Sequence, residues 1–391
     1  MIRINHHNDD SRKQPHGQLQ SCTIILPSSS HFYDYWAKCI AAIFTNSQVI
    51  FLNELNGDNT EIITSILEQN YNDWVFIEPT LRIKIEKIYS NKLNHNYGLC
   101  LLLFDNHYLY RRLYLPWASI SDLVICENPF YTGMYRRYAI NSHFLPYPFE
   151  RLKLDSSHFS SEITPELLVS FVGNITQLKP YRKFYLDFLN KNGLKVEIYG
   201  YGSNNGYISY QEMVDIFSKS YISLNFTQGT FEASSKEDLV YERILNGRIF
   251  EIVAAGGLCL CEYSTACSLV WEDLREIVYF FDEHDLLEKI RYLTQNPNIA
   301  RDIRKNAYQK YCAEFSGEVF SQNLKDKLLK CKNIGLNLNL EIQKIIYTDE
   351  FILESKKSLP SITFRSIIVK LLRILGIHEK LIADFRKMWY K

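Results

Sequence analysis

The strongest constraint on the fold is an alternation of short apolar runs with helix-length segments. In the first half the segments Phe32–Phe44, Glu61–Glu68 and Tyr131–Tyr138 are helix-length. The apolar runs between them are Cys22–Leu26, Val49–Leu52, Trp74–Ile77, Leu99–Phe104, Leu123–Cys126 and His143–Leu145. A parallel pair of strands needs a long crossover connection, usually a helix, so this alternation predicts a parallel sheet covered by helices.

The same alternation starts again after an interruption by Pro146, Pro148 and the polar stretch Asp155–Ser161. Its predicted strands are Leu168–Val172, Lys195–Tyr199, Tyr221–Phe226 and Leu258–Cys261, with helices at Tyr181–Asn190, at Tyr210–Lys219 and before Ala255. A chain of 391 residues is also too long for one hydrophobic core. We therefore predict an α/β protein with two Rossmann-like domains that face each other across a cleft.

The predicted domain boundaries follow from the same interruptions. We expect a disordered polar tail over residues 1–20 and an N-terminal Rossmann-like domain over 21–155. A C-terminal Rossmann-like domain is expected over 162–330, followed by a helical extension over 331–391. His6 and His7 lie in the polar tail and are assigned no function.

Charge and cysteine usage exclude several classes of protein. Lys plus Arg equals Asp plus Glu at 44 each, so no basic field is present to attract nucleic acid. Most of the nine cysteines lie in apolar runs, which is typical of reduced thiols. The first twenty residues lack the apolar stretch of a signal peptide, and no run is long enough to span a membrane. We therefore expect a cytoplasmic location.

The last segment, Leu353–Lys391, is locally basic and differs from the rest of the chain. Its apolar residues recur at helical spacing: Ile367, Ile368, Leu371, Leu372 and Leu375. One interpretation is a helix that lies on the anionic inner face of a membrane. The other interpretation is a terminal helix that packs on the protein itself.

The most informative motif is NGRIFEIVAAGGLCLCE, residues 246–262, which predicts a helix followed by a buried strand. Arg248 and Glu251 share one face of the helix, and Gly256 is suited to end it at a positive φ. The small residues up to Gly257 would let a ligand approach the backbone, and Glu251 would accept hydrogen bonds from a vicinal diol. The alternative is an ordinary helical ion pair followed by a glycine cap.

This motif resembles the donor-site motif of glycosyltransferases with the GT-B fold, and is most similar to the CgeB-like members of the group 1 superfamily. The resemblance covers about residues 168–320. It implies that Glu251 binds the ribose of a nucleotide sugar and that Gly256 and Gly257 lie close to the donor. It further implies a bacterial enzyme of glycan biosynthesis that transfers a hexose from a nucleoside diphosphate sugar, without need for a metal.

Two further segments resemble parts of the same donor domain. SFVGN, residues 170–174, resembles the first strand–helix loop, so Gly173 and Asn174 are predicted donor contacts. Arg182 at the following helix start is a predicted phosphate contact, or alternatively a solvated cation. After the strand in VEIYGYG, residues 196–202, Tyr207 is predicted to stack on the nucleobase and Ile208 to offer it backbone groups.

One position departs from the pattern of the retaining group 1 enzymes. Eight residues before Glu251, where those enzymes often carry a glutamate, this chain has Arg243. Arg243, together with Arg248, would stabilise the departing nucleoside diphosphate. The stereochemical outcome therefore stays open. The same region is distantly similar to GT-B fucosyltransferases, and the departure also allows a non-catalytic scaffold or sensor that binds sugar nucleotides.

In the N-terminal half, Asp105, Asn106 and His107 directly follow the apolar run Leu99–Phe104. Strand carboxyl ends are where open α/β sheets bind ligands, so Asp105 or His107 is a predicted general base, with Glu127 as a further candidate. Alternatively, Asp105 caps a helix and His107 is structural. The acceptor is expected on this domain and is a glycan, a lipid-linked sugar or a protein.

The acidic run FFDEHD, residues 280–285, contains an Asp-x-x-Asp spacing of acids that suggests a metal site. Apolar residues surround it, and acids are common in the first turn of a helix because they favour the positive end of its dipole. We therefore predict a helix start there.

Overall fold

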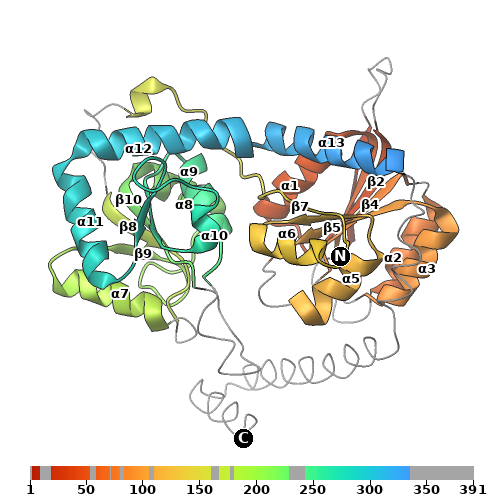
Figure 1. Cartoon of the computed structure of the whole chain (residues 1–391), viewed down its shortest axis with the longest axis horizontal. Coiled ribbons are helices and arrows are strands. Elements are labelled where there is room, and N and C mark those ends of the chain that lie inside the picture. Colours follow the sequence, from red (N-terminus) through yellow and green to blue (C-terminus); the bar gives the residue numbers. More distant parts are fainter. Residues whose placement is uncertain are drawn as a thin grey trace, which may run out of the picture.

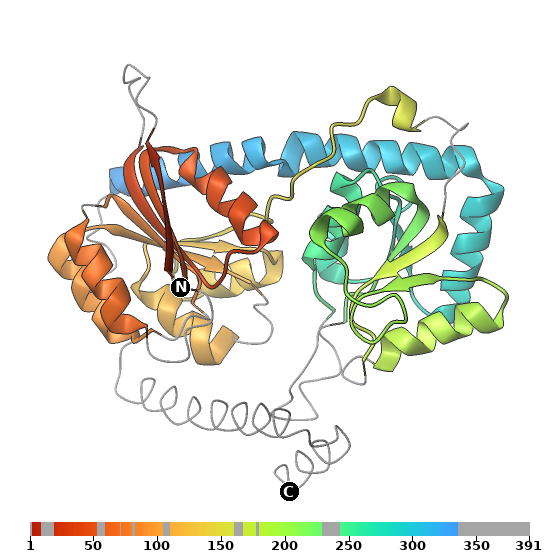
Figure 2. The ribbon, with the colours of Figure 1, turned by 180° about the vertical axis from the view of Figure 1, so that it is seen from behind.

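The computed structural model describes residues 2–8, 19–52, 59–70, 72–79, 83–104, 110–159, 167–176, 180–228 and 243–334. Two α/β lobes lie side by side, each built on one sheet that helices cover on its faces (Figures 1 and 2). The predicted α/β fold with two Rossmann-like domains is confirmed. Asp105 and His107 lie outside the described residues, as do the basic segment 353–391 and the extension beyond residue 334.

The N-terminal sheet has seven strands in the order β1-β3-β2-β4-β5-β6-β7. The strands are β1 (Ile2–Asn8), β2 (Leu19–Leu26), β3 (Phe44–Leu52), β4 (Trp74–Ile77), β5 (Gly98–Leu103), β6 (Leu123–Cys126) and β7 (Ser142–Phe144). Its helical segments are α1 (His31–Ala41), α2 (Thr60–Gln69), α3 (Ile85–His95), η1 (Tyr110–Tyr114), α5 (Leu115–Ile120) and α6 (Pro129–Arg136). The central strands β4, β5 and β6 are buried along their whole length, which explains why they are continuous apolar runs.

Strand β1 departs from the predicted disordered tail over residues 1–20. It pairs antiparallel with β3 at the edge of the sheet, from Ile2 opposite Leu52 to Asn8 opposite Asn46. The physical reason is that an edge strand is held by main-chain pairing to one neighbour, so a largely polar segment suffices. A composition without apolar runs therefore does not exclude a strand there.

The C-terminal sheet is entirely parallel, in the order β12-β11-β10-β8-β9. Its strands are β8 (Leu167–Val172), β9 (Glu197–Tyr199), β10 (Ser220–Asn225), β11 (Cys259–Glu262) and β12 (Val278–Phe280). Its helical segments are α7 (Pro180–Lys191), α8 (Tyr210–Lys219), α9 (Gly247–Ala254), α10 (Thr265–Ser268), α11 (Glu283–Gln295) and α12 (Pro297–Lys310). The strand order reverses between β8 and β10, and open α/β sheets bind ligands at the carboxyl ends of strands at such a point.

The chain crosses between the lobes for the first time through an irregular segment, residues 145–155, that is followed by the short turn η2 (Ser156–Phe159). The hydroxyl of Tyr311 accepts a hydrogen bond from Phe149 N at 2.9 Å and donates to Phe149 O at 2.8 Å. The hydroxyl of Tyr308 likewise accepts from Leu154 N at 3.2 Å and donates to Leu152 O at 2.5 Å. Two tyrosines therefore fix the crossing segment to the C-terminal lobe.

The second crossing is helical and returns the chain to the N-terminal lobe. From α12 the chain passes through η3 (Tyr311–Phe315) into α13 (Gly317–Ile334), and the two helices run along both lobes (Figure 1). The hydroxyl of Ser321 on α13 donates to Cys39 O of α1 at 2.7 Å. The predicted boundary at residue 330 assigns α13 to the C-terminal domain, whereas its apolar side packs on α1. In the described part of the chain no helix has the length and apolarity that a membrane span requires.

Candidate functional site

The loops that follow β8 and β9 form the floor of the carboxyl edge of the C-terminal sheet. Gly200 has a φ of +108° and packs so closely on the Gly173 carbonyl that a Cβ at this position would overlap it. Gly173 N donates to Tyr199 O at 2.9 Å, and Ile175 N donates to Tyr201 O at 2.9 Å. The two loops therefore form one tightly packed unit in which only glycine fits at position 200.

Asn174 and Arg182, two predicted donor contacts, are engaged within this unit. The Asn174 side chain accepts from Thr176 N at 2.8 Å, and Arg182 Nη1 donates to Asn174 O at 3.1 Å. Arg182 also lies over the Phe171 ring, with its guanidinium carbon 5.7 Å from the centroid. The guanidinium of Arg182 points into the protein and stabilises the loop. This arrangement does not favour the predicted contact of Arg182 with a phosphate.

The predicted nucleobase residues differ in their accessibility. Tyr207 is 73% exposed, and its ring centroid lies 5.4 Å from that of Tyr201. Ile208 is half-buried against the core. The exposed ring of Tyr207 is free to stack on a planar ligand, and its role as a base contact stays a prediction.

Helix α9 begins at the same edge and carries the predicted ribose-binding carboxylate. Asn246, the residue before the helix, donates from Nδ2 to Phe226 O at the end of β10, at 2.9 Å. In the first turn of the helix, Arg248 Nη1 donates to Glu251 Oε2 at 2.5 Å, and Arg248 also donates to the sulfur of Met213. The Glu251 side chain is 15% exposed. Burial raises the pKa of Glu251 above its ordinary value, and Arg248 offsets part of this rise.

A residue of the N-terminal lobe lies close to this pair. The ring of His31, the first residue of α1, stacks on Tyr210 of α8 with centroids 3.9 Å apart. His31 Nε2 lies 3.3 Å from Glu150 Oε2 in the crossing segment. Burial raises the pKa of Tyr210, and the charges of Glu251 and Glu150 raise it further. Arg248, the partner of Glu251, contacts Met213 of α8, about one turn after Tyr210, so Glu251 lies beside this stack at the junction of the lobes and not in open solvent.

The glycine turn after α9 lies at the opposite end of the helix, which corrects one prediction. Gly256 has a φ of +72°, and a Cβ on it would overlap Leu154 and come within 3.0 Å of His158 Nε2. Its carbonyl accepts from Arg304 Nε at 3.0 Å. Since α9 runs from the carboxyl edge to the amino edge of the sheet, Gly256 and Gly257 pack on the crossing segment and on the core, and do not approach a donor at the carboxyl edge.

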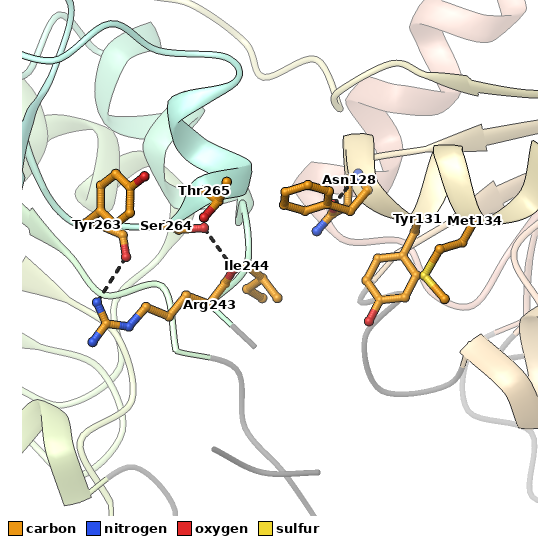
Figure 3. Close-up of a pocket in the computed structure, with 9 residues that line it drawn as sticks. Asn128, Tyr131, Met134, Arg243, Ile244, Tyr263, Ser264 and Thr265 are labelled. Atoms are coloured by element: carbon orange, nitrogen blue, oxygen red, sulfur yellow. Dashed lines mark hydrogen bonds between the residues drawn. The ribbon is translucent and has the colours of Figure 1, made fainter. Parts of the chain in front are cut away.

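A cleft of about 360 Å³ separates the lobes at the carboxyl edges of the two sheets (Figure 3). The N-terminal lobe contributes α6 and the residue before it, and the C-terminal lobe contributes the segments around Arg243 and after β11. The lining residues are Asn128, Phe130, Tyr131, Met134, Arg243, Ile244, Tyr263, Ser264 and Thr265. Of the residues predicted to be catalytic, the described structure places Arg243, which lines this cleft, and Glu127, which lies between β6 and the lining residue Asn128.

Glu262, at the end of β11, is a residue that the sequence interpretation missed. Its side chain is only 2% exposed, and Oε2 accepts from Thr227 N at 2.9 Å and Gln228 N at 3.3 Å. Its other oxygen lies 3.5 Å from Arg243 Nη2. The available signal was a glutamate that directly follows four apolar residues at a strand end, where a buried charge needs partners.

The acidic run after β12 forms a helix start, as predicted. Asp282 is the residue before α11, and its Oδ1 accepts from Asp285 N at 2.8 Å. Among the residues that the structure describes, no group of three or more His, Cys, Asp and Glu side chains is arranged to hold a metal ion. The independence of donor binding from a metal ion stays a prediction.

Similarity to known proteins agrees with this geometry. Residues 182–326 match the family described as glycosyl transferase-like. HepE from Anabaena, solved with UDP and glucose, is 10% identical, covering 79% of this chain and 99% of its own, with a TM-score of 0.55. Sucrose-phosphate synthase from Thermosynechococcus elongatus is 10% identical, covering 81% and 100%, with a TM-score of 0.57.

These similarities show the fold of the whole chain. The two lobes have the GT-B fold, and the resemblance to group 1 glycosyltransferases with that fold is confirmed. The more specific resemblance to CgeB-like members stays a prediction. None of the curated proteins matches the sequence.

Proposed function

We propose that this protein transfers a hexose from a nucleoside diphosphate sugar to an acceptor bound between its two lobes. The family match of residues 182–326 and the GT-B fold support a transferase, and HepE, a protein of the same fold, was solved with UDP and glucose. The single observation that carries the proposal is the half-buried Arg248–Glu251 pair at the junction of the lobes. A half-buried carboxylate with one cationic partner supports a role in binding the nucleotide.

The donor is expected to lie along the carboxyl edge of the C-terminal sheet. Arg248 occupies Oε2 of Glu251, while no described residue donates a hydrogen bond to Oε1, which is therefore available to a ribose hydroxyl. The first turn of α9 presents main-chain amides whose dipole favours the negative charge of a diphosphate. Arg243 adds a cation in the cleft, so these groups together would neutralise the diphosphate without a metal ion.

The acceptor is expected on the N-terminal side of the cleft, next to α6. Phe130 is an exposed aromatic residue there, and Asn128 lies beside it. A glycan, a lipid-linked sugar and a protein side chain all remain candidates. Asp105, His107 and Glu127 remain the proposed sources of a general base, and retention or inversion of the sugar stays open because Arg243 stands where a glutamate is common.

The experiment is a thermal-shift screen with UDP, GDP, ADP and their sugars, followed by calorimetric titration of the nucleotide that raises the melting temperature. Replacing Glu251 with Ala should weaken binding of that nucleotide about 10- to 100-fold, because hydrogen bonds to a charged group contribute about 1.5–3 kcal/mol. Glu272→Ala is the matched control, since Glu272 forms an exposed pair with Arg275 at 2.9 Å in the same i,i+3 spacing. The proposal fails if no nucleotide binds, or if Glu251→Ala and Glu272→Ala bind it equally.

Turnover separates an enzyme from the scaffold or sensor that Arg243 also suggests. Slow hydrolysis of the bound nucleotide sugar to free sugar and nucleoside diphosphate is expected of a transferase without its acceptor. Tight binding with neither hydrolysis nor transfer to any offered acceptor would instead favour the sensor.

A further inference from the structure

A continuous chain of hydrogen bonds runs along the carboxyl edge of the C-terminal sheet and ends in the cleft. From Arg182, which binds Asn174 O, the chain continues through Nε to the Tyr181 hydroxyl at 3.1 Å. That hydroxyl donates to Gln228 O at 2.6 Å, and Gln228 N donates in turn to Glu262. The loops after β8 and β10 and the end of β11 are thereby connected to one carboxylate.

Glu262 is the centre of this chain. A buried carboxylate is costly unless hydrogen bonds and an opposite charge compensate it. Oε2 receives hydrogen bonds from Thr227 N and Gln228 N, and also from Thr227 Oγ1 at 3.2 Å. Because these groups already satisfy Oε2, the oxygen that faces Arg243 is left to act on that arginine.

Arg243 is held from several sides. Nη1 donates to Tyr263 O at 3.2 Å, and the Ser264 hydroxyl donates to Arg243 O at 2.8 Å (Figure 3). Its main chain pairs with that of Gln228, and Ile244 N donates to Thr227 O at 2.9 Å. Both the backbone and the guanidinium are thus fixed, and the guanidinium points away from α6 toward Tyr263, on the C-terminal side of the cleft (Figure 3).

The two arginines of the chain differ in what they can reach. Arg182 is 9% exposed, whereas the side chain of Arg243 is 42% exposed and lines the cleft. A guanidinium has five N–H donors, and the contacts to Glu262 and Tyr263 use two of them. Within the described residues, Arg243 therefore keeps donors for a ligand, whereas Arg182 is buried and supports the loops.

We propose that Glu262 is a positioning residue that holds the Arg243 guanidinium on the C-terminal side of the cleft for contact with the diphosphate of the donor. This inference rests on the proposed function. A free arginine loses conformational entropy when it binds a ligand, and a side chain that is already held loses less. Replacing Glu262 should therefore weaken binding of phosphate groups through Arg243, without affecting the nucleoside.

The test is a double-mutant cycle with Arg243→Ala, Glu262→Gln and the double variant. Calorimetry measures the affinities for UDP, GDP, ADP, their nucleosides and inorganic pyrophosphate. Arg243→Ala should weaken diphosphate binding about tenfold or more, the effect of one charge-assisted contact, and Glu262→Gln about three- to tenfold, because the arginine is kept but is no longer held. Glu262→Gln should add nothing in the Arg243→Ala background, and nucleoside binding should not change in any variant.

The matched control is Asp122→Asn in the N-terminal lobe. Asp122 is also a buried carboxylate, with Lys92 Nζ at 2.9 Å and a hydrogen bond from Leu99 N at 2.7 Å, but it precedes β6 at the amino edge of its sheet. The Asp122→Asn variant should have a lower melting temperature but the wild-type affinity for every nucleotide, nucleoside and pyrophosphate tested. If Glu262 has a purely structural role, Glu262→Gln will behave in the same way, and this result would overturn the proposal.

Two further outcomes are decisive. If Glu262→Gln does not fold, Arg243→Lys tests the same placement, because lysine keeps the charge but lacks the planar donors that Glu262 and Tyr263 hold. Wild-type diphosphate affinity in Arg243→Lys would contradict the proposal. If the wild type binds pyrophosphate but no nucleotide, the proposed function fails, and the cycle with pyrophosphate still decides the role of Glu262.

Discussion

The two ends of α9 show how one continuous motif is divided between binding and packing. At the carboxyl edge, Arg248 and Glu251 lie at the junction of the lobes, next to the stack of Tyr210 and His31. At the amino edge, Gly256 packs against the segment that crosses between the lobes. The small residues that follow the glutamate are therefore explained by close packing, and the charged residues before them by the position of the cleft.

This difference teaches that proximity in sequence is a poor guide to proximity in a site. Arg248 is eight residues before Gly256, about 12 Å along the axis of α9 at 1.5 Å per residue, and Glu251 is five residues before it, about 7.5 Å. Changes at the two ends should consequently affect different properties. Stability should respond at the glycine end, and ligand affinity at the glutamate end.

The largest effect is expected from Gly256→Ala. The new Cβ meets the Leu154 side chain in a left-handed backbone conformation, so overpacking and backbone strain together should cost about 3 kcal/mol of unfolding free energy. Gly193→Ala is the control, because Gly193 also has a positive φ but open space around it, and should cost about 1 kcal/mol. Denaturant unfolding measures both, and equal costs would show that packing on the crossing segment is unimportant.

The next effect concerns pH at the glutamate end. The pKa of Glu251 is raised by burial, so its carboxylate form is lost as the pH falls through a value above the ordinary 4.5. Nucleotide affinity should then fall about tenfold per pH unit below that pKa. The stability contribution has the opposite sign, because the folded state holds this proton more tightly than the unfolded state and is favoured at low pH. Titrations of wild type and Glu251→Gln at several pH values check this, and a pH profile that Glu251→Gln leaves unchanged would contradict it.

A smaller effect is expected from Arg304→Met at the glycine end. Arg304 donates to Gly256 O and has Nη2 3.2 Å from His158 Nε2, so its loss should cost about 1 kcal/mol. The pKa of His158 is lowered by burial and further by Arg304, and should rise when the cation is removed. NMR titration of His158 measures the shift. The nucleotide affinity of Arg304→Met should equal that of the wild type. A lower affinity would show that the glycine end of α9 also contributes to ligand binding.

The smallest effect is expected from Glu272→Ala. Its pair with Arg275 is exposed, so the change in unfolding free energy should be below about 0.5 kcal/mol. The comparison with Glu251→Ala in denaturant unfolding shows how much of the Arg248–Glu251 interaction depends on its burial.

Much of the fold could be predicted from periodicity. The runs Trp74–Ile77 and Leu123–Cys126 are strands with the predicted bounds, because strands buried on both faces are uniformly apolar. Strand β1 could not be predicted in this way, since main-chain pairing at an edge leaves no apolar signature. The return of α13 to the N-terminal lobe likewise depends on tertiary packing that a helical pattern does not specify.

The candidate site could be predicted only in part. Glu251 lies at the junction of the lobes and Arg243 lines the cleft. Their charges indicated from sequence that they could bind a hydroxyl group and a phosphate, respectively. Arg182 has the same residue type and a similar place after a strand, yet it is buried by Phe171 and Asn174, which is decided by side-chain direction. Glu262 lacked a visible partner in sequence, because Thr227, Gln228 and Arg243 approach it only when β10 and β11 are adjacent.

The double crossing between the lobes also limits how the cleft can open. A single flexible tether would let the lobes reorient freely, whereas here both the irregular segment after β7 and the helical path from α12 to α13 join them. Two attachments define an axis, so the main relative motion open to the lobes is a hinge rotation about that axis. Substrates should then enter when this rotation moves α6 away from Arg243, while the contacts of Tyr311 at the hinge are kept.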